Sequence, residues 1–541
     1  MTRTPTHDDP PAARLFPLVL KVLSLLLISS GVGLLAAKKL NLGLVPGAVI
    51  GLSVFGVCLF AVMKLKGAPR EMGFTFGLKF LSVTAYKILN VTLVLWLSKD
   101  LGYSEQGAFN LIVGWSLFMT LTTILAGSIT DALGLRRTLL IGMSLCVLTR
   151  LVMVFSTNSL LALVCGLFPL AVGEALCTPV LVAAMRRYSL PQQRSVAFSL
   201  FYALMNFGFM FGYFVFDGVR ETMLKQGPLS IPILHAELSA FRTLLLVSMS
   251  IELIMLPLIL LLRPGVEMTR DGLISVPEGH QYPGVGFWEK IRLTACDAAK
   301  DTLRTFSGLV RSEGFYRLLV FLLMIGLLKV VFNAMDYIMP HFTLRELGPG
   351  ARVGRLNAIN GILILILAPA IGMMTRKYAS YAMVILGGFI TASSFVFMAL
   401  PVTVFQGMAD GWLGKAIGNG YLEITGAVHP YYVMIFFWQV LFSVGEAFYS
   451  PRVYEYAASI APRGQEASYS SLSYIPLLIG KLITGAAFGG LLAKYCPEQG
   501  TRRPDQMWLI IGLMVLVAPV GLLLLRPFIR MKEEGREETT S

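Results

Sequence analysis

Val172–Pro179 reads VGEALCTP, and Val444–Pro451, 272 residues later, reads VGEAFYSP. Each copy places one glutamate inside a long apolar stretch. A second register relates the preceding segments, in which Lys87 of the first half corresponds to Lys329 of the second. Ionised side chains within apolar helices are costly and usually mark a permeation pathway. The repeat therefore predicts a duplicated membrane protein whose halves each bury one lysine and one glutamate.

The composition supports a membrane protein and argues against several other classes. Of the 541 residues, 55% are hydrophobic and 14% are charged, whereas soluble domains have about 25% charged residues. The net charge of +14 is expected to reflect basic residues beside the spans, because no basic tract is interleaved with aromatic residues as in nucleic-acid binders. The six cysteines show neither zinc nor disulfide spacing. No metal, cofactor or enzymatic activity is expected, because nucleophile–base sets and phosphate loops are absent from the sequence.

Apolar runs long enough to cross a bilayer predict the architecture, since about 20 residues are needed for each helix. We expect an all-α membrane protein of about 14 transmembrane helices, with an N-terminal two-helix hairpin before two six-helix bundles. The expected spans lie near 15–37, 42–64, 76–98, 105–127, 137–157, 160–185, 195–217, 241–262, 317–340, 354–375, 379–400, 430–450, 467–493 and 507–526. The expected domains are the hairpin (1–70), the first bundle (71–262), a linker with an amphipathic helix (263–316), and the second bundle with a tail (317–541).

Basic residues in the short loops predict the orientation. They concentrate on the side that would hold both termini and the 263–316 linker, so this side is expected to be cytoplasmic in a multi-pass inner (plasma) membrane protein. The first apolar run is longer than a signal-peptide core and favours an uncleaved helix. Gly43, Gly47 and Gly51 form a stripe that permits close helix packing. The hairpin could use this stripe to dock against the main bundle or against a second protomer.

The segment Gly127–Arg137 reads GSITDALGLRR and joins the second and third helices of the first bundle. This GxxxDxxGxRR pattern resembles the loop signature of the major facilitator superfamily. The resemblance implies that Asp131, Arg136 and Arg137 act in gating.

Two further motifs resemble proton-dependent oligopeptide transporters over roughly residues 76–526. Gly445–Pro451 with Ala461 and Pro462 is similar to their tenth-helix GE…P…AP pattern, and Phe201–Gly208 is similar to their FYxxxNxG signature. The resemblance implies that Glu446 receives the amino group of a peptide. The first-helix ExxERF motif of that family is missing, since Ser82–Ala85 reads SVTA. The family's fourth-helix lysine falls at Thr178.

The depth of the four repeated charges predicts a common site. At 1.5 Å per residue, Lys87, Lys329, Glu174 and Glu446 all fall near the middle of a bilayer core about 30 Å thick. Each would cost about 2.5–3.5 kcal/mol if left alone. Lysine–glutamate pairs across a cavity would offset much of this cost, whether they serve transport or only hold helices together.

Further residues complete the predicted site. Candidates for substrate binding besides Lys87, Lys329 and Glu446 are Lys481, Asn90, Asn333, Tyr86 and Trp438. Core packing is an equal alternative for Trp438. Asp336 is expected to guard the outer mouth, and Glu174 is the candidate proton carrier because a midplane carboxylate can have a raised pKa. Arg150 and Glu252 are expected to be structural.

These features predict a secondary active transporter that works by alternating access. The expected substrate is a small zwitterionic or anionic, peptide-like solute, and the expected coupling is proton symport. A uniporter or exchanger of small organic anions is one alternative. A non-transporting sensor or scaffold is the other, although a scaffold would gain little from charges at midplane.

Overall fold

The computed structural model describes residues 68–189, 194–232, 236–269, 272–275, 313–375, 378–459 and 475–529, together with a few isolated positions between 285 and 300. The hairpin expected over 1–70 and most of the 263–316 linker, including its amphipathic helix, lie outside the described residues. The total of about 14 helices and the domain boundaries therefore stay predictions.

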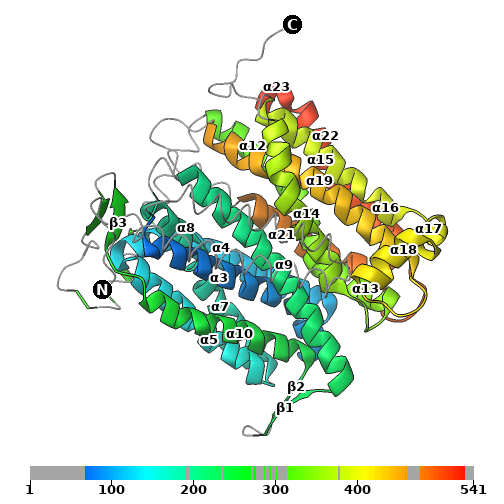
Figure 1. Cartoon of the computed structure of the whole chain (residues 1–541), viewed down its shortest axis with the longest axis horizontal. Coiled ribbons are helices and arrows are strands. Elements are labelled where there is room, and N and C mark those ends of the chain that lie inside the picture. Colours follow the sequence, from blue (N-terminus) through cyan, green and yellow to red (C-terminus); the bar gives the residue numbers. More distant parts are fainter. Residues whose placement is uncertain are drawn as a thin grey trace, which may run out of the picture.

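The first half of the chain forms a helical bundle, coloured blue to green in Figure 1. Its elements are α3 (Arg70–Leu95), η1 (Trp96–Asp100), α4 (Glu105–Leu133), α5 (Leu135–Phe155), α6 (Ser159–Leu161), η2 (Ala162–Leu167), α7 (Phe168–Ala175), α8 (Thr178–Arg187), α9 (Arg194–Gln226) and α10 (Ala240–Leu260). Two short antiparallel pairs accompany them, β1 (Leu229–Ile231) with β2 (Ala236–Leu238) and β3 (Val266–Thr269) with β4 (Gly272–Ser275).

The second half forms another bundle, at the upper right of Figure 1. Its elements are α12 (Glu313–Asn333), η4 (Ala334–Ile338), α13 (Met339–Leu347), α14 (Val353–Met374), α15 (Ser380–Ser394), α16 (Val396–Ala399), η5 (Val402–Phe405), α17 (Gln406–Asp410), α18 (Trp412–Gly414), η6 (Lys415–Tyr421), α19 (Pro430–Ser459), α21 (Ile475–Tyr495), α22 (Pro504–Leu524) and α23 (Arg526–Ile529). Each span expected between 76–98 and 507–526 has a helical counterpart in the two bundles.

The two ends of the first bundle can be told apart by their connections. The start of α3 and the end of α10 meet where Arg263 donates a 3.0 Å hydrogen bond to Glu71, and we call this the linker end. The opposite end carries β1 and β2 between α9 and α10, and Arg220 there reaches the carbonyl of Pro349 between α13 and α14. We call it the hairpin end.

Helix α9 packs on α14, and α4 packs on α21, so these two contacts join the bundles. The second contact is very close, because a Cβ at Gly485 of α21 would overlap Cγ2 of Val113. Small residues allow such approaches between membrane helices.

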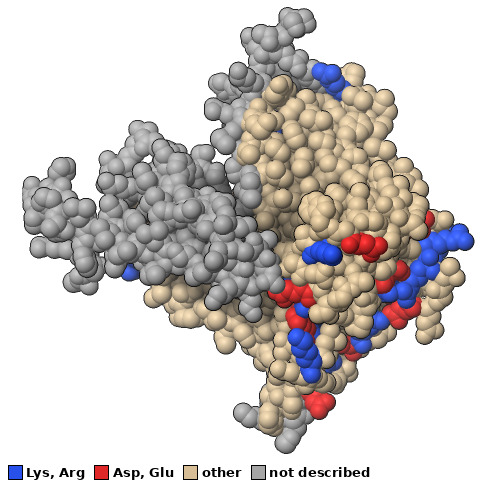
Figure 2. Space-filling model, turned by 45° about the vertical axis from the view of Figure 1, so that its right-hand side comes forward, with Lys and Arg blue, Asp and Glu red and all other residues tan. Residues whose placement is uncertain are grey.

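The described helices have the character of membrane spans. Nine of them are long and apolar enough to cross a bilayer. Large apolar side chains such as Leu121, Leu160 and Leu524 are exposed on the outside, as expected for a surface that faces lipid. In Figure 2 the charged side chains gather mainly along the lower right edge of the face shown. The chain is an integral, multi-pass membrane protein.

Several helix boundaries differ from the expectation, and two of these differences have a clear physical reason. Helix α3 begins at Arg70, six residues early, because Glu71 in its first turn is buried and paired with Arg263. The expected loop Gly127–Arg137 is largely helical, since α4 runs to Leu133 and α5 begins at Leu135. Only Gly134 breaks the helix, at a positive φ of 86° that glycine adopts without strain.

Candidate functional site

A buried hydrogen-bonded network links the two bundles. Lys87 of α3 lies 2.9 Å from both carboxylate oxygens of Asp336 in η4. Asn90 donates a 2.7 Å hydrogen bond to Asp336 Oδ2, and Tyr213 of α9 donates a 2.6 Å hydrogen bond to Oδ1. Tyr337 donates in turn to Asn90 Oδ1 at 2.8 Å. We call these five residues the interbundle network.

Local structure explains how the network forms. Lys87 and Asn90 are three residues apart and therefore share one face of α3. Gly212 lets α9 approach this face, because a Cβ there would lie only 3.0 Å from Lys87 Cβ. Asp336 and Tyr337 lie in the π-helical turn η4, which interrupts the run from α12 to α13. π-helical turns are rare in proteins, and those that do occur are often found at functional sites.

The network satisfies a buried ion pair. The side chains of Lys87 and Asp336 are each 8% exposed, so both charges lose most of their hydration. The Asp336 carboxylate accepts hydrogen bonds from an ammonium, a phenol and an amide, which satisfies the oxygen lone pairs that burial would otherwise leave without partners. Removing one partner from a buried pair costs about 3–5 kcal/mol because the other charge stays buried. The bundles are thus joined by a contact whose strength depends on charge.

Glu446 is held by neutral groups rather than by a lysine. Asn360 of α14 donates to Glu446 Oε2 at 2.8 Å and to Ser443 Oγ at 3.0 Å. Glu446 is 4% exposed, and both Lys329 and Lys87 are within electrostatic range of its carboxylate.

Two interior ammonium groups of the second bundle lie on aromatic rings instead of on carboxylates. Lys329 Nζ of α12 is buried and lies 4.6 Å from the ring centre of Phe332. Lys481 of α21 is half-buried and crosses to the other bundle, where its Nζ lies 5.5 Å from the ring centre of Trp115. Among the described residues neither ammonium forms an ion pair. Asn333 lies at the contact between α12 and α21, where a Cβ at Gly480 would lie 3.4 Å from its Nδ2.

Glu174 lies in a separate triad inside the first bundle. Arg150 of α5 contacts Glu174 of α7 at 2.6 Å and also pairs with Glu252 of α10. All three residues are buried. The expected lysine–glutamate pairing is therefore wrong for Glu174, whose partner is Arg150, and for Lys87, whose partner is Asp336. Cys146 Sγ and the two carboxylates lie within 4.8 Å of one another, but both carboxylates already pair with the Arg150 guanidinium.

The other predicted residues take different places. Tyr86 is half-buried and within electrostatic range of both Glu174 and Asp336. Trp438 is fully buried, and its ring centre lies 5.7 Å from those of Phe395 and Trp508. These contacts fit the core-packing alternative for Trp438, because the side chain belongs to the aromatic core of the second bundle; its contact with substrate stays a prediction.

The predicted gating residues fall at both ends of the molecule. Asp336 belongs to the interbundle network. Arg136 is half-buried and Arg137 is exposed in the first turn of α5. The side chain of Asp131 lies outside the described part of the structure, so its pairing with these arginines stays a prediction.

Sequence reasoning missed Tyr213, Asn360 and Lys79. Lys79 of α3 is 2% exposed, lies 4.9 Å from the ring centre of Phe201, and is within electrostatic range of Glu174. Isolated polar residues within apolar spans were the available signal. On α19, Gln439, Ser443 and Glu446 recur at helical spacing and would have indicated one polar face.

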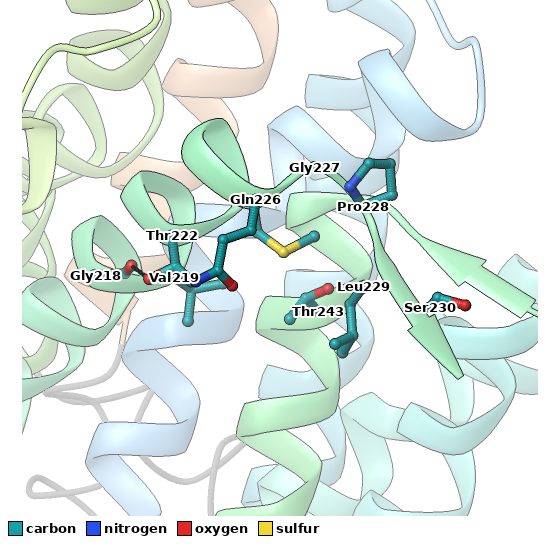
Figure 3. A pocket seen from close by; sticks show the side chains of 10 residues that line it. Gly218, Val219, Thr222, Gln226, Gly227, Pro228, Leu229, Ser230 and Thr243 are labelled. Atoms are coloured by element: carbon teal, nitrogen blue, oxygen red, sulfur yellow. Dashed lines mark hydrogen bonds between the residues drawn. The ribbon is translucent and has the colours of Figure 1, made fainter. Parts of the chain in front are cut away.

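A cavity of about 330 Å³ opens between α9, β1 and α10 at the hairpin end, shown in Figure 3. Its lining includes Thr222, Gln226 and Thr243 but no charged side chain. It contains none of the predicted site residues and is separate from the network.

Cross-bundle contacts cluster at the hairpin end. Ion pairs join Lys99 to Glu498, Arg345 to Glu105, and Arg352 to Glu221. Gln106 donates a 2.7 Å hydrogen bond to the carbonyl of Gly485. Together with the network, these contacts close the hairpin end.

Comparison with known proteins identifies the fold family. The model of the Major Facilitator Superfamily matches residues 75–422, which is more than half of the chain. No curated protein sequence matches.

Several solved structures are similar across most of the chain. A peptide transporter (POT) in complex with sulfate is 16% identical with a TM-score of 0.62, covering 85% of this chain and 95% of its own. A POT family transporter in complex with 5-aminolevulinic acid is 15% identical with a TM-score of 0.64, covering 86% of this chain and 97% of its own. A mutant of a POT peptide transporter in complex with alafosfalin is 17% identical with a TM-score of 0.62, covering 86% of this chain and 96% of its own. At these identities the similarity shows the fold.

Proposed function

This chain belongs to the Major Facilitator Superfamily of membrane transporters, and we propose that it is a proton-coupled symporter for a small zwitterionic or anionic, peptide-like solute. It would work by alternating access, with the substrate bound between the two bundles.

The observation that carries this proposal is the pair of interior ammonium groups, Lys329 and Lys481, without ion pairs in the described part of the chain. A cation–π contact contributes about 0.5–2 kcal/mol, which is less than the cost of about 2.5–3.5 kcal/mol for a lysine at midplane. A substrate carboxylate or phosphate would offset the remainder. Such a substrate would therefore bind beside these two ammonium groups, which contact aromatic rings instead of carboxylates.

Glu446 supplies the complementary charge. Among the described residues its carboxylate accepts a hydrogen bond from the neutral amide of Asn360 and forms no ion pair, so a substrate amine can pair with it. Two cations opposite one carboxylate favour an anion or a zwitterion over a cation. The similar transporters solved with sulfate and with 5-aminolevulinic acid are consistent with this class of solute.

The interbundle network supplies the gate at the hairpin end. If the basic loops mark the cytoplasmic side, closure at the hairpin end corresponds to an inward-facing state. A proton on Asp336, or a substrate anion competing for Lys87, would weaken the contact between the bundles and allow the opposite state.

Glu174 remains the proposed proton carrier. One guanidinium, Arg150, faces two carboxylates, and it can neutralise only one of them. The second carboxylate can then take a proton during the cycle. Glu174 is 5% exposed and Glu252 1% exposed, so Glu174 is the one nearer to water.

A ligand screen by thermal shift tests the substrate class. Dipeptides, amino acids and small organic anions are added to the purified protein, with Glu446→Gln as the control variant. We expect stabilisation by a zwitterion or an anion, and the zwitterion's effect should be smaller in the variant. Stabilisation by cations alone would contradict the proposal.

A further inference from the structure

One face of α9 contacts the second bundle at the hairpin end. Asp217 lies four residues after Tyr213, and Arg220 and Glu221 lie three and four residues after Asp217, so all four lie on one side of the helix. Tyr213 belongs to the interbundle network. The other three contact the loop between α13 and α14 or the first turn of α14.

Asp217 caps α14 from the other bundle. Its Oδ1 accepts a 2.8 Å hydrogen bond from the backbone N–H of Gly354, and its Oδ2 accepts a 2.6 Å hydrogen bond from that of Arg355. Asp217 is 4% exposed. The first N–H groups of a helix need partners from outside it, and Arg352 at the N-cap position provides no side-chain cap. The cap that α14 uses therefore belongs to α9.

Gly354 makes this approach possible. A Cβ at this position would overlap the carbonyl oxygen of Tyr213, which is backbone and cannot rotate away. Arg220 secures the preceding loop by donating a 2.9 Å hydrogen bond to the carbonyl of Pro349, and Glu221 pairs with Arg352. Each contact joins α9 to the segment that leads into α14.

We propose that Asp217 and Gly354 form a seal at the hairpin end, in which α14 has a capped N-terminus only while the two bundles are closed there. Opening this end removes the carboxylate from the two N–H groups and leaves them to water. Only the role of this seal in transport rests on the proposed alternating access. The seal differs from the Lys87–Asp336 contact, because its donors are backbone N–H groups at the start of a helix and not a side-chain ammonium.

Hydrogen–deuterium exchange of the full-length protein tests the seal without any substrate. Two peptides are followed, one containing Gly354 and Arg355 and one around Gly485, where α21 packs on α4. In Asp217→Ala and in Gly354→Ala we expect exchange in both peptides to be at least about tenfold faster, since hydrogen bonds to a charged acceptor are lost and the whole end opens. Gly350→Ala is the matched control, because nothing lies within 4 Å of a Cβ there.

Each outcome decides the proposal. Faster exchange in both peptides, with the control unchanged, supports the seal. Faster exchange at the start of α14 alone shows a local cap, and unchanged exchange shows no dependence on Asp217; either result overturns it. If Gly354→Ala does not fold, Asp217→Asn replaces it, because an amide oxygen keeps one acceptor and should give an intermediate rate. Because the exchange experiment uses no substrate, its result can be interpreted even if no transport is detected.

Discussion

Single buried charges carry most of the chemistry in this protein. Asp336 is the clearest case, because its carboxylate binds Lys87, Asn90 and Tyr213 at once. A residue with so many partners would support stability as well as the proposed gating, so substitutions must separate the two roles.

Asp336→Ala should destabilise the protein by about 3–5 kcal/mol, because the Lys87 ammonium stays buried without a counter-ion. The double variant with Lys87→Gln should recover part of this loss, since the buried charge is gone. Thermal unfolding in detergent measures both effects. If the two single losses simply add in the double variant, the two residues do not interact energetically.

Lys329→Gln and Lys481→Gln should reduce anion uptake more than they reduce stability. Removing an interior ammonium that lacks an ion pair among the described residues relieves a desolvation cost while it removes the anion's partner. Lys494→Gln, an exposed position on the same helix as Lys481, is the matched control. Equal losses of uptake in all three variants would indicate that the two interior lysines have no special role.

Glu174→Gln should abolish proton-driven accumulation and spare counterflow exchange, because only the coupled process needs the proton. Glu252→Gln is the comparison, since this glutamate pairs with the same arginine. Liposome assays with and without a pH gradient distinguish the two processes. Identical behaviour of the two variants would assign Glu174 a structural role.

At the scale of helices, we expect the close packing of α4 on α21 to control the closure of the hairpin end. Gly485→Ala should open this end, because the new methyl would overlap Val113, a β-branched side chain with little freedom. Gly490→Ala on the same helix is the control, since its nearest neighbour is 3.9 Å away.

Carbodiimide cross-linking of Lys99 to Glu498 reports this change, because the two side chains form an ion pair. The hydrogen bond from Lys99 lowers the pKa of Glu498 below its ordinary value, so the pair remains charged at neutral pH. The Lys99–Glu498 ion pair should be lost only in acid, as the pH falls through the lowered pKa of Glu498. We expect a lower yield in Gly485→Ala. An unchanged yield would show that the α4–α21 contact does not control closure.

Helix positions could be predicted from apolar runs, but their ends could not. Hydropathy does not detect a first turn such as that of α3, where Glu71 is buried because Arg263 pairs with it. Likewise the GSITDALGLRR segment has loop-like composition, yet it is helical except at Gly134. The interruptions at η4 and between α7 and α8 each come just before a proline, Pro340 and Pro179, in the first turn of the next helix, so proline was the signal available in the sequence.

At the scale of the whole molecule, the duplication predicted two bundles with charges at similar depth. It could not predict which charges pair, because pairing depends on how the bundles dock. Lys87 reaches Asp336 across the interface, whereas Glu174 turns toward Arg150 within its own bundle. The sequence predicts how deep each charged residue lies along its helix. Which neighbour its side chain faces depends on how the helices pack.

The most direct test of the account is uptake by the purified protein in liposomes under an imposed proton gradient, with wild type and Lys329→Gln side by side. We predict that at least one dipeptide, amino acid or organic anion accumulates in wild-type liposomes and that the variant loses most of this accumulation. Absence of uptake for every solute, or equal uptake by the variant, would contradict a transport site built on these buried charges.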